Sequence, residues 1–496
     1  MKKTNFLSLF MLFIICNFIE INAQRLTPSP SKLPRINGAK VFGVRPNSPI
    51  LFKIAVSGEK PIRYEVTGLP IGIQLDKETG IITGKLSKRG DYLMQVKVSN
   101  SLGKAQRNLT IKVGDEIALT PPMGWNSWNC WGKDVSKAKV LSSAQAMIDK
   151  GLIDHGWNYI NIDDAWEGER AADGSIQSND SFPDMKGLGD WMHARGFKFG
   201  MYTAPGPKTC LGFTGSYQHE LQDMTTYASW GVDYVKSDWC SYGGIFAQEK
   251  DSSLAAVKKP YLKMYDAIKA QNRDIYYSVC QYGMREVWKW GESVGANSWR
   301  TSGDIEDTWE SVREIGFNQF DLFPYAKPGH WNDPDMLVVG NVGWGKNLHP
   351  THLTPDEQYT HVSLWSLLAA PLLLGCDIAT LDDFTLSLLT NDEVLDVNQD
   401  PLGKQARRVY CMRSRYTFQL YAKELEDGSV ALGIFNMLNK TIKYHDLSFK
   451  QMHIQGGMVR DIWRQKDLGV FDDIFKVEIP AHGVLLLKIS KVDEKK

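Results

Sequence analysis

From residue 119 onward, short apolar runs alternate with longer stretches of helical periodicity. Eight strand-like runs lie at 123–128, 159–163, 198–202, 234–238, 275–280, 298–303, 329–335 and 371–376. Helix-like stretches such as 138–148 and 254–266 separate them. This alternation is typical of βα units on a parallel sheet. With a final helical run at 392–398, it predicts an α/β fold, a (β/α)8 TIM barrel over residues 116–403.

Two flanking regions have the period of strands and no helical spacing. Residues 38–115 predict an N-terminal Ig-like β-sandwich, because short alternating runs are bounded by Gly, Asn or Lys-rich turns. These runs are 50–56, 80–84, 92–98 and 108–113. Residues 404–496 predict a C-terminal antiparallel β-sandwich, with runs at 417–422, 430–435, 475–479 and 483–489. No cluster of exposed aromatic residues marks the first module, so we expect a spacer rather than a sugar-binding module.

The first residues predict export. Residues 1–23 resemble a secretory signal peptide, with two lysines, an apolar stretch and the small Ala23 before cleavage. The apolar stretch is short for a membrane span. A lipoprotein signal at Cys16 is the alternative, and the bulky Ile15 before it argues against that reading. Export would place the protein in the periplasm or outside the cell, where disulfides form. Residues 24–37, rich in Pro, Ser and Arg, predict a linker.

Composition narrows the possible partners. The formal net charge is zero, which argues against nucleic acid or an anionic membrane surface as a partner. A hydrophobic content of 43% and a charged content of 23% are those of a soluble globular protein. The chain has 16 tryptophans, a residue that often forms platforms for sugar rings but also fills cores.

The candidate chemistry centres on the run 232–240. Side chains alternate along a strand, so Tyr234, Lys236 and Asp238 share one face, which points into a closed barrel. Lys236 and Asp238 could form a buried structural ion pair, because opposite charges favour each other's ionised form. A repeated pattern argues for an active site instead, since barrel sites lie at the carboxyl ends of the strands. The residues at those ends are Trp125, Trp128, Asp163, Asp164, Tyr202, Lys236, Asp238, Gln281, Tyr282, Arg300, Asp304, Asp333 and Asp335.

These residue types favour acid chemistry without a cofactor. The barrel has no His-x-His pair and no His-Glu-x-x-His motif, and carboxylates interleaved with Lys and Arg repel a cation, so we predict no metal site. No glycine-rich phosphate loop stands at a strand-to-helix junction. Acids beside tryptophan platforms point to glycoside hydrolysis, which needs two carboxyl groups flanking one bond.

Six ordered motifs resemble glycoside hydrolase family 27, whose members include α-galactosidases and α-N-acetylgalactosaminidases. The motifs are LTPPMGWNSW (119–128), IDDAW (162–166), GVDYVKSDWC (231–240), WRTSGD (299–304), GHWNDPDML (329–337) and NQDPLG (398–403). The resemblance runs from residue 119 into the C-terminal domain. It implies that Asp238 is the nucleophile and Asp304 the acid/base.

The resemblance also implies a galactose pocket. Its members would be Trp128, Asp163, Asp164, Tyr202, Lys236, Gln281, Arg300 and Asp335. Asp163 and Asp164 match acids that hold the C4 and C6 hydroxyls, and Lys236 matches a lysine at O3 and O4. Arg300 matches an arginine near O2 and the nucleophile, and Trp128 an indole under the ring.

The chain departs from the family in two respects. Where the family commonly reads Cys-Glu-Trp after the fifth strand, this chain reads CQY at 280–282. In family members that segment faces the C2 substituent, so the choice between galactose and its N-acetylamino relative stays open. Of the family's bridges the chain keeps one matching pair, Cys210 and Cys240. The partners of two further cysteines are replaced by alanine, and we expect Cys376 and Cys411 to be buried thiols.

The expected function is therefore a secreted, retaining, exo-acting α-galactosidase without a cofactor, acting on oligo- or polysaccharides. We expect Asp238 ionised beside Lys236, and Asp304 kept protonated in a dry setting with Arg300 turned towards the nucleophile. The alternatives are an α-N-acetylgalactosaminidase, a β-L-arabinopyranosidase, and a sugar-binding protein that has lost its chemistry. The last requires loss of Asp238 or Asp304, and both are present. The sequence leaves linkage and oligomeric state open.

Overall fold

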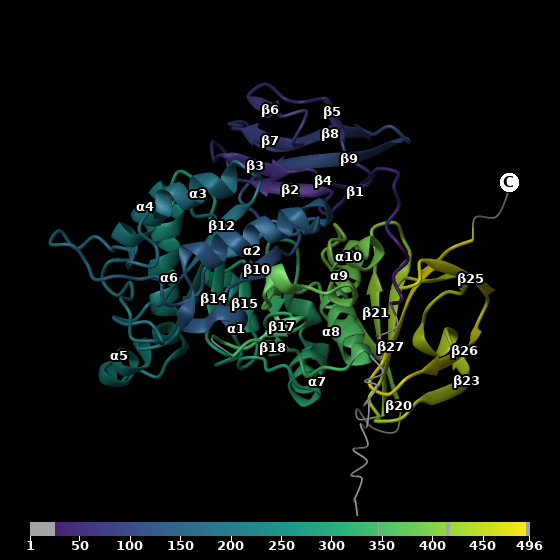
Figure 1. The fold of residues 1–496 in the computed structure, drawn as a ribbon. Coiled ribbons are helices and arrows are strands. Elements are labelled where there is room, and N and C mark those ends of the chain that lie inside the picture. The colour runs from purple at the N-terminus through teal and green to yellow at the C-terminus, as the bar shows by residue number, and fades with distance from the viewer. Residues whose placement is uncertain (1–24, 346, 413–416, 493–496) are drawn as a thin grey trace, which may run out of the picture.

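The computed structural model describes residues 25–345, 347–412 and 417–492. Figure 1 shows three parts: a purple N-terminal β-module, a central barrel in blue to green, and a yellow C-terminal β-domain. The predicted signal peptide lies outside the described residues. Within them, no helix has both the length and the apolar character needed to cross a bilayer.

The N-terminal module is the predicted β-sandwich. Its strands are β1 (Arg35–Asn37), β2 (Val41–Val44), β3 (Ile50–Lys53), β4 (Ala55–Ser57), β5 (Arg63–Thr67), β6 (Ile73–Leu75), β7 (Ile81–Gly84), β8 (Gly90–Ser99) and β9 (Lys104–Val113). They form a four-stranded sheet β2-β9-β8-β5, a three-stranded sheet β3-β7-β6 and the pair β1-β4. Alternate residues such as Ile82 and Ile111 are fully buried between the sheets.

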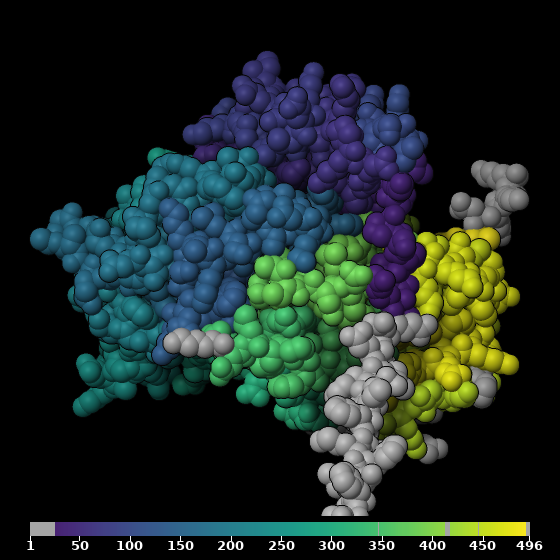
Figure 2. All heavy atoms as spheres, viewed as in Figure 1, coloured from purple at the N-terminus to yellow at the C-terminus, as the bar shows by residue number. Residues whose placement is uncertain are grey.

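The segment predicted as a linker is not one throughout. Its last residues form β1, which pairs with β4, so they belong to the module. Earlier in the segment, the Leu26 amide donates to the Tyr359 hydroxyl and the Thr27 hydroxyl donates to the Ser387 carbonyl. These contacts hold the segment along the outside of the barrel, where Figure 2 shows it in purple beside the green helices.

The central domain is the predicted barrel. Its eight parallel strands lie in the order β16-β15-β14-β13-β12-β11-β10-β19. They are β10 (Met123–Asn126), β11 (Tyr159–Asn161), β12 (Lys198–Thr203), β13 (Tyr234–Asp238), β14 (Tyr276–Cys280), β15 (Ser298–Arg300), β16 (Trp331–Asp333) and β19 (Leu372–Leu374). Seven of the eight predicted runs contain one of these strands, and the run 198–202 covers all of β12 except Thr203. Between the seventh and eighth, a single parallel bridge from Leu337 to Leu374 joins the two edges.

Helices surround the strands and fill the connections. They are α1 (Trp128–Trp131), α2 (Lys137–Asp149), α3 (Met185–His193), α4 (Glu220–Trp230), α5 (Tyr242–Glu249), α6 (Leu254–Lys269), α7 (Trp309–Phe317), α8 (Pro355–Leu367), α9 (Asp383–Leu389) and α10 (Asp392–Asn398). A short hairpin, β17 (Asn341–Val342) and β18 (His349–Pro350), precedes α8. The helix α8 starts with a capping box between Thr354 and Glu357, which satisfies two of the free amides of its first turn.

The N-terminal module covers the amino ends of the barrel strands. Arg45 Nε lies 2.6 Å from an Asp274 carboxylate oxygen, just before β14. Lys198, the first residue of β12, places its ammonium 5.3 Å from the Phe42 ring centroid. A cavity of about 90 Å³ between module and barrel is lined by residues at the starts of several strands, including Met123. The opposite, carboxyl face of the barrel is left for the candidate site.

The C-terminal domain packs on the barrel side. Its strands are β20 (Arg407–Met412), β21 (Phe418–Glu424), β22 (Val430–Asn436), β23 (Ile442–Ser448), β24 (Gly457–Asp461), β25 (Lys466–Phe471), β26 (Ile474–Ile479) and β27 (Val484–Ser490). They form a six-stranded antiparallel sheet, β20-β21-β22-β27-β24-β25, and the pair β23-β26. Trp463 donates its indole N–H to Ser363 of α8 at 2.8 Å. Tyr421, Phe435 and Trp463 join the barrel's own core cluster.

One buried lysine lies at this interface. Lys423 on β21 donates to the carbonyl oxygens of Ser366 and Val397. Burial lowers the pKa of Lys423 to about 7. Between pH 7 and the ordinary lysine pKa, this amine is therefore protonated in most unfolded chains but neutral in most folded ones.

We predict that the free energy of unfolding rises from pH 7 to about pH 9, because the unfolded state binds more protons across that window. The slope from Lys423 is at most about 1.4 kcal/mol per pH unit. Lys423→Met should flatten this rise, whereas Lys404→Met, at an exposed lysine, should keep it. Urea unfolding at several pH values measures the effect. An equal slope in wild type and Lys423→Met would contradict the assignment.

Candidate active site

The predicted site residues gather at the carboxyl ends of the barrel strands. Parallel register places Tyr202 beside Lys236, Asp238 beside Cys280 and Arg300 beside Asp333 on neighbouring strands. Asp163 and Asp164 lie two and three residues after β11, and Asp335 lies two residues after β16. Because all eight strands run the same way, these side chains meet at one mouth.

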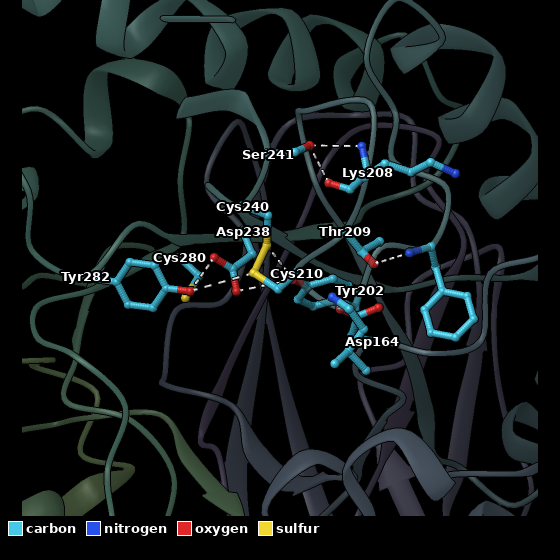
Figure 3. Close-up of a disulfide and its surroundings, with 12 residues drawn as sticks. Asp164, Tyr202, Lys208, Thr209, Cys210, Asp238, Cys240, Ser241, Cys280 and Tyr282 are labelled. Carbon is cyan, nitrogen blue, oxygen red and sulfur yellow. Dashed lines mark hydrogen bonds between the residues drawn. A yellow bond between two sulfur atoms is a disulfide. The ribbon is translucent and has the colours of Figure 1, made fainter. Parts of the chain in front are cut away.

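Asp238 is a buried carboxylate held by two phenols. It exposes 5% of its surface. The Tyr282 hydroxyl donates to its Oδ1 at 2.8 Å, and the Tyr202 hydroxyl to its Oδ2 at 3.3 Å, as seen in Figure 3. Burial raises the pKa of Asp238, while the charge of Lys236 and the Tyr282 hydrogen bond oppose that rise. The two hydrogen bonds thus orient the Asp238 carboxylate, which has no cation in direct contact among the described residues.

The counterion of Lys236 is Asp163. Its ammonium lies 2.9 Å from Asp163 Oδ2, and the two side chains are 12% and 3% exposed. The Asn126 amide donates to the same oxygen at 2.9 Å. The alternative of a structural ion pair between Lys236 and Asp238 is therefore ruled out, because the inward-pointing lysine reaches past its own strand to the end of β11. Its positive charge still acts on Asp238 through space.

Asp164 is held by backbone amides. Its Oδ1 accepts from the Ala165 amide at 2.8 Å and its Oδ2 from the Leu211 amide at 2.9 Å. Burial raises the pKa of Asp164. Leu211 follows Cys210, which is bonded to Cys240 as predicted. The disulfide therefore ties the loop that holds Asp164 to the end of the strand that carries Asp238, an arrangement visible in Figure 3.

The disulfide also touches both phenols. The Tyr202 hydroxyl lies 3.0 Å from Cys240 Sγ, and the Tyr282 hydroxyl lies 4.0 Å from Cys210 Sγ. The bridge thus packs behind the two groups that orient the nucleophile candidate. The other described cysteines are free: Cys130, Cys280 and Cys376 are buried, and Cys411 is exposed. The prediction of a buried thiol is wrong for Cys411, which lies on the outermost strand β20 of its sheet.

Asp304 lies in a different environment. Its side chain is 61% exposed, and its Oδ1 lies 3.1 Å from Arg300 Nη2. The same nitrogen lies 2.9 Å from Asp335 Oδ2. The predicted dry setting for Asp304 is wrong, and so is the expectation that the Arg300 guanidinium turns away from it. The short turn at 301–304 folds Asp304 back over Arg300 and leaves its carboxylate open to solvent.

The remaining predicted residues differ in how deeply they are buried. Trp128 is half-buried at the start of α1. Asp335 is buried and also accepts from the Ile305 amide at 2.9 Å. Gln281 is fully buried and its Nε2 donates to the Met284 carbonyl, so its contact with a sugar stays a prediction. Burial raises the pKa of Asp333 to about 6.

Three residues that support the site were not among the sequence candidates, and a fourth, Tyr282, was named only for its place at a strand end. Tyr282 and the Leu211 amide hold carboxylates directly, and Asn126 holds Asp163. Glu167 is buried beside Asp164, and its Oε2 accepts from the Ala165 amide at 3.1 Å. Burial and the nearby Asp164 hold the pKa of Glu167 well above its usual range. Asn126 and Tyr282 lay within quoted motifs, but nothing in the sequence connected Leu211 or Glu167 to the site.

A family model described as "Alpha galactosidase A" matches residues 120–400, and one for the "Alpha galactosidase C-terminal beta sandwich domain" matches residues 416–489. The chain belongs to this family, glycoside hydrolase family 27. An Ig-domain model matches residues 34–114, in agreement with the N-terminal module.

Individual relatives extend over most of the chain. The "Alpha-galactosidase A" of Cellvibrio japonicus is 38% identical over 401 residues, which are 76% of this chain and 93% of the relative. A solved structure from Bacteroides fragilis has a TM-score of 0.87 and 38% identity, and covers 93% of this chain and 98% of its own. A β-L-arabinopyranosidase of Geobacillus stearothermophilus has a TM-score of 0.68 and 26% identity, and covers 76% of this chain and 98% of its own. The predicted α-galactosidase type of glycoside hydrolase is confirmed.

We predict that Tyr282→Phe lowers kcat/KM by roughly 10- to 100-fold, the usual effect of losing a hydrogen bond to a charged group. Because that bond lowers the pKa of Asp238, its loss should move the acid limb of the pH profile to higher pH. Tyr444→Phe, in the C-terminal domain, is the matched control. An unchanged acid limb in Tyr282→Phe would show that the phenol does not tune the carboxylate.

We predict that replacing both Cys210 and Cys240 by Ser raises KM, because the Leu211 amide would no longer be held against Asp164. Stability should fall by roughly 2–4 kcal/mol, the typical contribution of a cross-link. Cys411→Ser changes an unbonded thiol and serves as the control. Mass spectrometry of the unreduced wild type checks the bridge itself. Free thiols at both positions would end the prediction.

Proposed function

We propose that the protein is an exported, retaining, exo-acting α-galactosidase that removes terminal α-D-galactosyl residues from oligo- or polysaccharides. The observation that carries the proposal is the contrast between two acids at one mouth. Asp238 is buried and aimed by two phenols, whereas the Asp304 side chain is 61% exposed. A nucleophile needs a fixed direction, and an acid/base needs access to the leaving group and to water.

The reaction would proceed in two displacements. Asp238 attacks the anomeric carbon, the glycosidic bond breaks, and Asp304 gives its proton to the departing oxygen. A β-linked glycosyl-enzyme results. Asp304, now ionised, takes a proton from water, and the hydroxide oxygen bonds to the anomeric carbon as the bond to Asp238 breaks. Arg300, 3.1 Å from Asp304, would hold this carboxyl group in place through both steps.

The depth of the polar groups supports exo-action. Asp163 and Asp164 expose 2% and 1% of their surfaces, and they match the acids that hold sugar hydroxyls. Hydroxyl recognition would thus lie at the closed end of the site, and the acid/base at its open end. A single terminal sugar would fill the closed end, and the rest of the substrate would extend past Asp304 into solvent.

Export rests on two features. Residues 1–23 have the composition of a signal peptide, and the Cys210–Cys240 bridge suits an oxidising compartment. The sugar preference rests on the galactose-binding acids and on the named relatives. Because a β-L-arabinopyranosidase shares the fold, the C6 arm of the sugar is the group that the test must vary.

We predict that proton NMR during the first minutes of nitrophenyl α-galactoside hydrolysis shows α-galactose before mutarotation. A double displacement retains configuration and needs the two carboxyl groups about 5–5.5 Å apart. Asp238→Ala should remain folded and release no galactose, and its unfolding would favour a structural role. Initial β-galactose would overturn the retaining mechanism. Nitrophenyl β-L-arabinopyranoside and α-N-acetylgalactosaminide, run in parallel, should be hydrolysed more slowly.

A further inference from the structure

Two histidines and a carboxylate converge at the rim of the barrel mouth, outside the residues assigned to catalysis. Asp307 lies in the loop between β15 and α7, three residues after Asp304. His349 lies in β18, and His352 lies in the turn that leads from β18 into α8. The three donor atoms lie within 4.8 Å of one another.

The carboxylate is the fixed member of this group. Asp307 is 7% exposed, and its Oδ2 accepts from the His352 backbone amide at 2.9 Å. His352 Nδ1 lies 3.0 Å from the same oxygen and His349 Nδ1 lies 3.8 Å from it. The His349 and His352 rings stack with centroids 4.6 Å apart. Both imidazoles therefore place a nitrogen near one carboxylate oxygen. His349 Nδ1 also lies 3.0 Å from the Pro350 carbonyl oxygen, a contact that a bound ion would replace.

These distances suit a tetrahedral transition metal. Bonds of about 2.0–2.2 Å to imidazole nitrogen and carboxylate oxygen place neighbouring donor atoms about 3.4 Å apart. The two nitrogen–oxygen distances, 3.0 and 3.8 Å, lie on either side of that value. The His352 side chain is 66% exposed, so it can adjust without disturbing packed neighbours.

We propose that Asp307, His349 and His352 form a site for a divalent transition-metal ion of the Zn²⁺ class, with water completing the coordination. Two imidazoles and one carboxylate suit Zn²⁺ and its neighbours, while Ca²⁺ and Mg²⁺ prefer oxygen ligands alone. The sequence led us to predict no metal site, because Asp307 is distant in the chain and only the fold brings it to the H-x-x-H pair at 349–352.

The site joins two loops at the mouth. One loop carries Asp304, and its middle is already held by the hydrogen bond from the Ile305 amide to Asp335. The bound ion would fix the far end of that loop to the connection between β18 and α8. It would thus brace the segment that carries the proposed acid/base without touching the substrate.

A second convergence of donors is excluded as a site. Within the described part of the chain, Cys210, Asp238 and Cys240 also lie close together. Their sulfurs are bonded to each other and offer no thiolate.

The test is metal binding by the full chain without a polyhistidine tag, in a Cys411→Ser background that removes the exposed thiol. Co²⁺ should bind once per chain and give the visible bands of a tetrahedral ion, and Zn²⁺ should displace it. His349→Gln and His352→Gln should each weaken binding by more than the roughly 10- to 100-fold that losing a hydrogen-bond partner of a metal ligand costs.

The control is His453→Asn, which changes an exposed histidine of the C-terminal domain and should bind Co²⁺ like the parent. All three variants should keep the parent's circular dichroism and its glycosidase activity in the presence of a chelator. Absence of Co²⁺ and Zn²⁺ binding would overturn the proposal. So would equal binding by His352→Gln, or a site that Ca²⁺ fills and Zn²⁺ does not.

Discussion

Burial of charge at the carboxyl end of the barrel is the constraint on which the site depends. Asp163 and Lys236 lie 2.9 Å apart with side chains 3% and 12% exposed, and either charge alone would cost several kcal/mol there. Because they neutralise each other, Asp238 can be held by hydroxyl groups that do not cancel its charge. A carboxylate in direct contact with the lysine would be a weaker nucleophile. The site therefore depends on which residues pair, Lys236 with Asp163 and Asp238 with the two phenols, as much as on the presence of these residues.

The sequence predicted where the charged residues lie along the chain, but not how they pair. Strand alternation placed Lys236 and Asp238 on one inward face, which is correct. The true partner, Asp163, lies two residues after β11, which is separated from β13 by β12. The reach of a lysine across that distance depends on barrel curvature. Arg300 and Asp304 were expected to point apart. The turn at 301–304 could not be predicted, because these residues have neither helical nor strand periodicity.

Dependence on a periodic pattern also explains which strands could be predicted from the sequence. All eight barrel strands were predicted because their apolar runs are enclosed on both sides and stand out from the helices between them. The strands β20, β23, β24 and β25 were missed, and two of them, β20 and β25, form the edges of the C-terminal sheet. In the N-terminal module β1, β2, β5 and β6 were also missed, and all four are short. The three residues of β1 lie beside a proline-rich stretch and carry no period. Short and edge strands depend on their partners more than on their own residues.

The N-terminal module lies over the amino ends of the barrel strands, through contacts such as that between Arg45 and Asp274. A barrel has two faces, and this one keeps its ancillary domain on the face without chemistry. If the enzyme is immobilised through the module, its mouth therefore points away from the support. Galactosides could then reach the mouth by diffusion from solution, without the module in their path.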